Sequence, residues 1–111
     1  MISIYCNENL RKTLTKNEIL EYTPAYNGES VGLDLYNVGP EMTLSPKSFD
    51  FGKFIPTGLH VSIPKGYVGI LTERGSVTKT KLKLRAGVID PGYTGEIFVN
   101  LVNIGTLSEI I

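Results

Sequence analysis

The chain has 111 residues, with 11 basic side chains, 11 acidic side chains and a single cysteine. This length suits one domain, and the balanced charge produces no overall field that would draw the protein to nucleic acid or to an anionic membrane. One cysteine excludes an intramolecular disulfide, and without clustered cysteine and histidine partners it does not indicate a zinc site. No window approaches the apolar length of a membrane span, so we expect a soluble protein. The single cysteine is compatible with a reducing, intracellular setting, and we expect a cytoplasmic location.

Glycine and proline interrupt the chain at short intervals, and β-branched and aromatic residues fill the segments between them. With 12 glycines and 6 prolines, this pattern predicts an all-β protein of short strands in a sandwich or barrel. Residues 2–5 alternate between apolar and polar side chains and predict a first strand. Residues 9–22 have a loosely helical spacing, and an irregular segment fits them as well as a helix does.

A further strand is predicted at residues 31–36, where alternate side chains are apolar and Asp34 lies on the other face. A carboxylate in the middle of a strand needs a reason, and a solvent-facing position in an antiparallel sheet is an ordinary one. The pattern also predicts strands at residues 42–44, 58–63 and 67–72, with a tight turn at 64–66. His60 would face outward, and we assign it no function.

Residues 73–79 break the strand pattern with a loop rich in glycine, serine and threonine. A guanidinium, free backbone N–H groups near a glycine and a hydroxyl form a good local receptor for an anion. From here to residue 85 the basic side chains are Arg74, Lys79, Lys81, Lys83 and Arg85. They fit either a solvated hairpin or a positive wall for a polyphosphate. Single-stranded nucleic acid is disfavoured because no aromatic side chains are interleaved to stack bases.

The most informative stretch is residues 86–96, which read Ala-Gly-Val-Ile-Asp-Pro-Gly-Tyr-Thr-Gly-Glu. Asp90 follows a predicted buried strand and precedes a Pro-Gly pair that forces a turn, so its carboxylate would be held at a corner. Tyr93 follows, and then a strand begins in which residues 97, 99 and 101 share an apolar face. An ordinary turn between two strands explains the same pattern.

Taken together, three passages resemble the homotrimeric dUTPase family in order and spacing. Residues 31–36 are similar to its first motif, residues 74–76 with their flanks to its second, and residues 86–96 to its third. Residues 56–67 also match a Thr-Gly-Leu and Ile-Pro-x-Gly-Tyr passage of the family. The resemblance implies a distorted jelly-roll, or β-clip barrel, that assembles as a trimer and hydrolyses dUTP to dUMP and pyrophosphate with Mg²⁺.

The resemblance also implies roles for the residues of the third motif. Asp90 would be the general base that activates the attacking water, which requires a carboxylate within hydrogen-bond reach of that water. The ring of Tyr93 would pack against the deoxyribose and leave no room for a 2′-hydroxyl. The backbone from Leu84 to Gly87 would pair with uracil.

The first and second motifs would hold the metal and the phosphates. Asp34 would bind Mg²⁺ through water, as is usual for this ion. Arg74, Gly75 and Ser76 would contact the phosphates and meet the charge that develops in the transition state. The family's second motif usually runs Arg-Ser-Gly or Arg-Ser-Ser, whereas here Gly75 follows the arginine and Ser76 comes one place late. The role of Ser76 therefore stays open.

Nothing in residues 1–111 matches the family's fourth motif or its glycine-rich C-terminal arm. We therefore expect a single dUTPase-like domain, in a bacterial or virus-infected cell, that lacks the C-terminal strand and the arm. Two functions stay open: a dUTP diphosphatase, and a dUTPase-fold binding, regulatory or virion-structural protein with weak or no catalysis. The related dCTP deaminases are disfavoured because Asn100 stands where they carry a catalytic glutamate.

Overall fold

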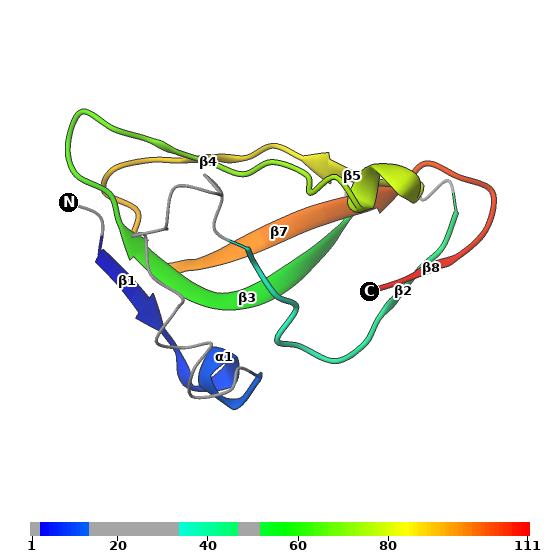
Figure 1. Ribbon diagram of the computed structural model, residues 1–111, viewed down its shortest axis with the longest axis horizontal. Coiled ribbons are helices and arrows are strands. Elements are labelled where there is room, and N and C mark those ends of the chain that lie inside the picture. The colour runs from blue at the N-terminus through cyan, green and yellow to red at the C-terminus, as the bar shows by residue number, and fades with distance from the viewer. Residues whose placement is uncertain (1–2, 14–33, 47–51) are drawn as a thin grey trace.

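The computed structural model describes residues 3–13, 34–46 and 52–111, and within these ranges the chain is mostly β, as predicted (Figure 1). In chain order the elements are β1 (Ser3–Cys6), α1 (Glu8–Thr13), β2 (Thr43–Leu44), β3 (Lys53–Ser62), β4 (Gly69–Ile70), the 3₁₀ helix η1 (Val77–Lys79), β5 (Leu82–Arg85), β6 (Val88–Ile89), β7 (Glu96–Asn103) and β8 (Glu109–Ile110). The predictions for residues 14–22 and 31–33 lie outside the described ranges.

Four strands form the main antiparallel sheet, in the order β1-β3-β7-β5. The long strands β3 and β7 pair at its centre and cross the middle of the molecule in Figure 1. Two shorter ladders, β2 with β8 and β4 with β6, lie outside this sheet. The predicted alternation in β7 is confirmed, because Ile97 is buried while Phe98 is exposed.

The short helix α1 is held by its cap and by one buried side chain. Asn7 precedes the helix and caps it, since its Oδ1 accepts the Leu10 N–H at 3.1 Å. The Nδ2 of Asn7 donates to the Glu96 carboxylate at 2.6 Å and so ties the cap to β7. Leu10 is fully buried, which contributes about 1.5–3 kcal/mol that an isolated helix of this length would lack.

Among the described residues, no helix is long and apolar enough to cross a membrane.

β3 bends where its register against β7 shifts, between Pro56 and His60. Gly58 adopts a left-handed backbone conformation there, with a φ of 69°. The Oγ1 of Thr57 donates to the Ile97 carbonyl at 2.6 Å, and Thr57 is 1% exposed. The bend is therefore fixed by a buried hydrogen bond to the neighbouring strand.

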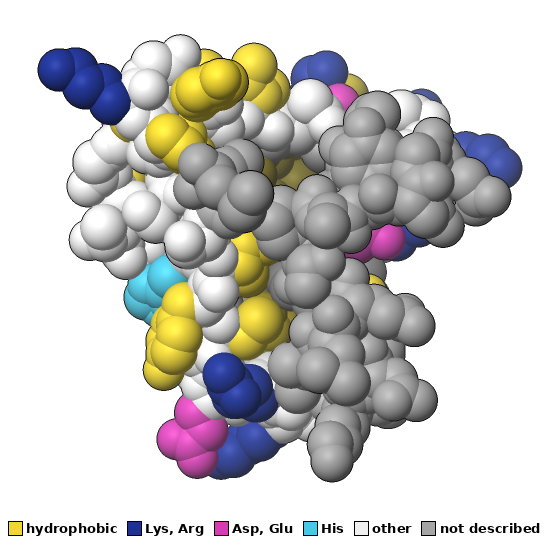
Figure 2. All heavy atoms as spheres, turned by 60° about the vertical axis from the view of Figure 1, so that its left-hand side comes forward, with side chains coloured by type: hydrophobic (Ala, Val, Ile, Leu, Met, Phe, Trp, Pro, Cys, Tyr) yellow, Lys and Arg dark blue, Asp and Glu magenta, His cyan; other side chains and the backbone are white. Residues whose placement is uncertain are grey.

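Beyond the bend, the predicted directions of the side chains are confirmed. Leu59 points into the core, and His60 lies on the surface, coloured cyan beside hydrophobic side chains in Figure 2. The Nδ1 of His60 lies 3.0 Å from the Thr94 carbonyl oxygen, and the ring meets that of Tyr5 edge to face. His60 thus links β3 to the turn that precedes β7.

The prediction that Asp34 lies within a strand is wrong. Residues 34–38 form no ladder with another strand, and Asp34 lies in an irregular segment on the surface. Asn37 explains part of this, because its Oδ1 accepts the Gly39 N–H at 2.9 Å and closes a local turn. Such side-chain bonds compete with the ladder that a strand would need.

The strand before Asp90 is also shorter and more exposed than predicted. The expected strand at 67–72 is reduced to β4, and its partner β6 is equally short. Val88 and its cross-strand partner Ile70 are 68% and 69% exposed, so the prediction of a buried strand before Asp90 is wrong for Val88, whereas Ile89 is half-buried and packs against the core. The side chains of Val88 and Ile70 lie on a face of the two-stranded ribbon that the other described residues leave exposed.

The last described strand returns to the middle of the chain. β8 pairs with β2, and Ile111 exchanges two backbone hydrogen bonds with Met42. Asn103, which is 2% exposed, fixes the connection before β8, because its Nδ2 donates to the carbonyls of Leu44 and Leu107.

Candidate active site

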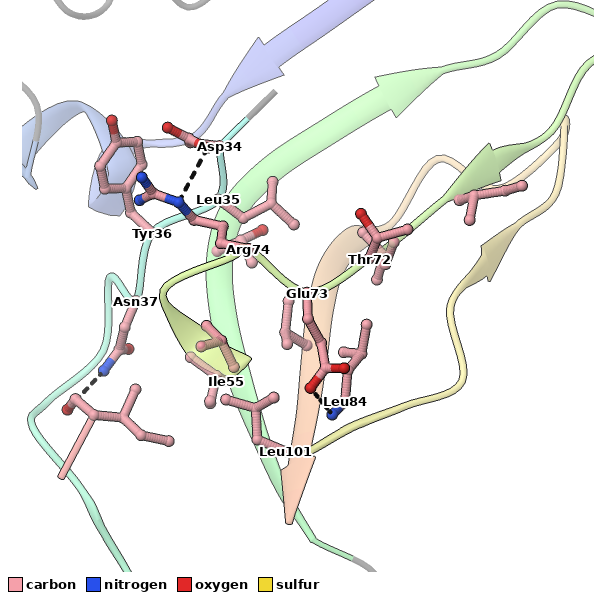
Figure 3. Close-up of a pocket in the computed structure, with 16 residues that line it drawn as sticks. Asp34, Leu35, Tyr36, Asn37, Ile55, Thr72, Glu73, Arg74, Leu84 and Leu101 are labelled. Carbon is pink, nitrogen blue, oxygen red and sulfur yellow. Dashed lines mark hydrogen bonds and ion pairs between the residues drawn. The ribbon is translucent and has the colours of Figure 1, made fainter. Parts of the chain in front are cut away.

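A cavity of about 380 Å³ lies against the main sheet (Figure 3). Its floor is apolar and comes from β3, β5 and β7, through Ile55, Leu84, Val99 and Leu101. Its rim is polar and includes Asp34, Glu73 and Arg74. An apolar floor beneath charged groups suits a small ligand that has both an apolar and an ionic part.

Asp34 and Arg74 face each other across the rim, as Figure 3 shows. The Arg74 Nε lies 3.7 Å from the Asp34 Oδ1, and the two side chains are 65% and 50% exposed. An ion pair this open contributes about 0–1 kcal/mol to folding. Both charges are therefore accessible to a ligand, and rearranging them would cost little.

Short-range hydrogen bonds shape the loop after Arg74. The Val77 N–H donates to the Arg74 carbonyl at 3.0 Å, and the Thr78 N–H to the Gly75 carbonyl at 3.2 Å. Gly75 and Ser76 are exposed, and neither lines the cavity. Ser76 precedes η1 without a capping bond from its side chain. The predicted loop is confirmed, with a turn of 3₁₀ helix at its end.

Glu73 is a rim residue to which sequence reasoning gave no role. Its Oε2 accepts the Leu84 N–H at 3.3 Å, and its Oε1 lies 3.6 Å from the Lys83 Nζ. The sequence signal was a single acid before a run of basic residues, but that signal does not identify a backbone partner. The Leu84 N–H, in the backbone stretch predicted to pair with uracil, thus already has an acceptor within the chain.

The Asp90 turn has the predicted form. The Tyr93 N–H donates to the Asp90 carbonyl at 3.1 Å and closes the turn, which leaves the Asp90 side chain exposed at its corner. The Tyr93 hydroxyl donates to the Glu96 carbonyl at 2.6 Å. A Cβ at Gly95 would lie 2.8 Å from the Tyr93 hydroxyl oxygen, so glycine lets the ring lie against the backbone. The ring is fixed at one end and 45% exposed.

The connection from β5 to β6 has an unusual backbone. Ala86 has a φ of 59°, a conformation that costs about 1–3 kcal/mol for a residue with a side chain and is often found at functional sites. The Gly87 carbonyl accepts the Leu71 N–H at 2.7 Å. A Cβ at Gly87 would come within 2.8 Å of the Leu71 carbonyl oxygen, so only glycine fits this close approach.

The predicted site residues fall into two groups in one chain. Asp34, Arg74 and Leu84 line the cavity. The others do not line it; they are Gly75, Ser76, Gly87, Asp90 and Tyr93. Within the described ranges, no group of His, Cys, Asp and Glu side chains is large enough to hold a metal ion by itself.

Comparisons with known proteins agree with the motifs. A family model for dUTPase matches residues 18–108. A deoxyuridine 5′-triphosphate nucleotidohydrolase of Mycolicibacterium vanbaalenii is 35% identical over 89 residues, which cover 78% of this chain and 54% of that protein. The chain spans about half the length of such curated relatives.

Solved structures are similar over almost the whole chain. The dUTPase of Staphylococcus bacteriophage 80alpha superposes with a TM-score of 0.73 at 29% identity, over 96% of this chain and 61% of that one. A mutant dUTPase of S. aureus phage phi11, described as coordinating a structural Mg(II) ion, has a TM-score of 0.69 at 31% identity, over 93% and 60% of the two chains. This chain belongs to the dUTPase family.

Proposed function

We propose that the chain hydrolyses dUTP to dUMP and pyrophosphate as a homotrimeric, Mg²⁺-dependent enzyme. The observation that carries the proposal is the Asp90 turn, which holds an exposed carboxylate beside the fixed, half-exposed ring of Tyr93. A general base must reach its water, and an exposed corner allows that. Tyr93 would exclude a 2′-hydroxyl by shape, and the backbone near Gly87 would recognise uracil.

The cavity rim would receive the phosphates. Arg74 offers donors, and the loop with Gly75 and Ser76 is open to solvent. Mg²⁺ commonly takes one or two carboxylates and completes its shell with phosphates and water. Asp34, as an exposed carboxylate beside Arg74, fits this partial ligand set. When bound there, the ion would neutralise phosphate charge.

We further propose that residues 1–111 form one domain whose β-clip barrel assembles as a trimer. Two observations support assembly. Asp90 and Tyr93 do not line the cavity of their own chain, and in a trimer a neighbouring subunit would bring these two parts of the site together. In addition, the β4–β6 ribbon leaves Val68, Ile70 and Val88 exposed, and apolar side chains gathered in this way often mark an interface. A cytoplasmic location stays a prediction.

The test is pyrophosphate release from dUTP, dCTP, dTTP and UTP in the presence of Mg²⁺. We expect release from dUTP alone, loss of release in Asp90→Asn, and no change in Glu8→Gln, whose carboxylate lies on α1. Sedimentation of the wild-type chain should give the mass of a trimer. Undiminished release by Asp90→Asn would refute the assigned base.

The second candidate is a nucleotide-dependent regulatory or structural protein with weak or no catalysis. Gly75 favours it, because the family's usual hydroxyl is absent at that place. The phage 80alpha dUTPase, which is similar to this chain, is described as controlling the transfer of virulence genes. A wild-type trimer that binds dUTP without releasing pyrophosphate would establish this alternative.

A further inference from the structure

The segment before Arg74 runs beside the segment that leads to Asp90. β4 pairs with β6 through Gly69 with Ile89 and Ile70 with Val88. The Leu71 N–H continues the contact by donating to the Gly87 carbonyl at 2.7 Å. At Ala86, with its φ of 59°, the backbone changes direction, and the backbone pairing between the two segments ends.

Beyond the end of this backbone pairing, the Glu73 side chain keeps the two segments in contact through Leu84. β5 is an edge strand of the main sheet, and its inner side pairs with β7. The Leu84 N–H points away from that pairing, and the Glu73 Oε2 accepts it at 3.3 Å. The other carboxylate oxygen lies 3.6 Å from the Lys83 Nζ, and the Glu73 side chain is only 23% exposed. A carboxylate thus takes the place that a neighbouring strand would occupy.

Glu73 and Arg74 are consecutive, yet they hold different parts of the candidate site. Figure 3 shows Arg74 pointing toward Asp34 and Glu73 pointing toward Leu84. Arg74 belongs to the proposed phosphate side, whereas Leu84 begins the stretch that leads through Ala86 to the proposed uracil contacts. A shift of Glu73 would therefore move the start of that stretch relative to the phosphate loop.

We propose that Glu73 is a positioning residue for uracil recognition, which acts by holding the Leu84 N–H and so fixing the Ala86–Gly87 turn. The proposal rests on the proposed function. Glu73 does not need to touch the nucleotide. Its effect falls on the affinity for the nucleoside part, because the turn that it fixes lies on that side. Removing a hydrogen bond to a charged group typically costs about tenfold in an equilibrium constant.

Three substitutions distinguish whether the hydrogen bond, the negative charge or the ion pair of Glu73 is responsible for an effect on binding. Glu73→Ala removes the acceptor and the charge, whereas Glu73→Gln keeps an oxygen that can accept the Leu84 N–H. Lys83→Met removes only the ion pair. Glu109→Ala is the matched control, because the Glu109 Oε1 accepts the Lys81 N–H at 3.4 Å near the same edge strand but does not line the cavity.

The experiment measures dissociation constants for dUMP and for deoxyuridine, together with amide hydrogen exchange in the free protein. In Glu73→Ala we expect faster exchange at Leu84 and Gly87 and about tenfold weaker binding of both ligands. Glu73→Gln, Lys83→Met and Glu109→Ala should bind dUMP within about twofold of the wild type. Thermal melts check that each variant is folded.

Each other outcome overturns the proposal. Unchanged binding by Glu73→Ala refutes positioning, and tighter binding would mean that the carboxylate blocks the Leu84 N–H. If Glu73→Gln is as weak as Glu73→Ala, charge and not the hydrogen bond is responsible. Failure of the wild type to bind dUMP or dUTP would overturn the proposed function, and this inference with it. Wild-type binding with an unaffected Glu73→Ala would overturn the inference alone.

Discussion

Gly75→Ser should increase dUTP hydrolysis. The substitution restores a hydroxyl directly after Arg74, where the family's second motif usually has one. A Cβ at Gly75 would meet no atom within 4 Å, and the φ of Gly75 is not in the left-handed region. The site is exposed, so we expect the free energy of unfolding to change by no more than about 0.5 kcal/mol. Any gain in activity would therefore come from the hydroxyl itself.

The expected size of the gain follows from one hydrogen bond to a phosphate oxygen. A bond to a charged group contributes about 1.5–3 kcal/mol, which corresponds to about 10- to 150-fold in rate. An exposed loop should give the lower end, so we predict about a tenfold rise in kcat/KM for dUTP. Initial rates of pyrophosphate release measure it, and Gly75→Ala is the matched control because it adds the Cβ without the hydroxyl. Equal rates for the serine and alanine variants would refute the reasoning.

Two further predictions concern stability. Gly58→Ala should lower the free energy of unfolding by about 2–4 kcal/mol in urea titrations, since Gly58 has a φ of 69° and a new Cβ would lie 2.6 Å from the Leu10 Cβ; an unchanged midpoint would contradict this. Burial raises the pKa of the Cys6 thiol above its ordinary value of 9.0, while nearby Arg11 lowers it by less. The unfolded chain then releases the thiol proton at a lower pH than the folded chain does. The stability that the protonated Cys6 thiol contributes is therefore fully present below about pH 9 and is lost as the pH rises through the folded pKa. Wild-type unfolding free energy should thus fall more steeply than that of Cys6→Ala above about pH 9, and parallel curves would disprove it.

The sequence predicted the parts of the site that local chemistry decides. The Asp90 turn follows from Pro-Gly after a short β segment, and the backbone bond from Tyr93 to Asp90 confirms it. The alternation in β7 reports its buried face, as Ile97 and Phe98 show. The resemblance to dUTPase rested on these same local patterns, and the comparisons confirm the family.

The remaining features depend on partners that are distant in the sequence. Asp34 could lie in a strand only if another segment of backbone paired with its own. The Asn37 side chain instead closes a local turn a few residues later in the chain. Val88 is as apolar as a core residue, yet its side chain is 68% exposed in the single chain. Glu73 could not be linked to Leu84 from spacing alone, because a carboxylate that accepts a backbone N–H leaves no periodic pattern.

The candidate site has a proposed phosphate side and a proposed nucleoside side, and ligands with and without phosphates can distinguish the contributions of their residues. Arg74, Gly75 and Asp34 belong to the proposed phosphate side, so their contributions require a ligand that carries phosphates. Glu73 acts through Leu84 on the proposed nucleoside side, so its contribution should persist with deoxyuridine. Glu73 and Arg74 are adjacent in the chain, yet each reports on a different part of the substrate. Because the two residues lie in the same loop, a double-mutant cycle of Glu73 and Arg74 would measure the coupling free energy between them. A large coupling would indicate that the loop moves as a rigid unit.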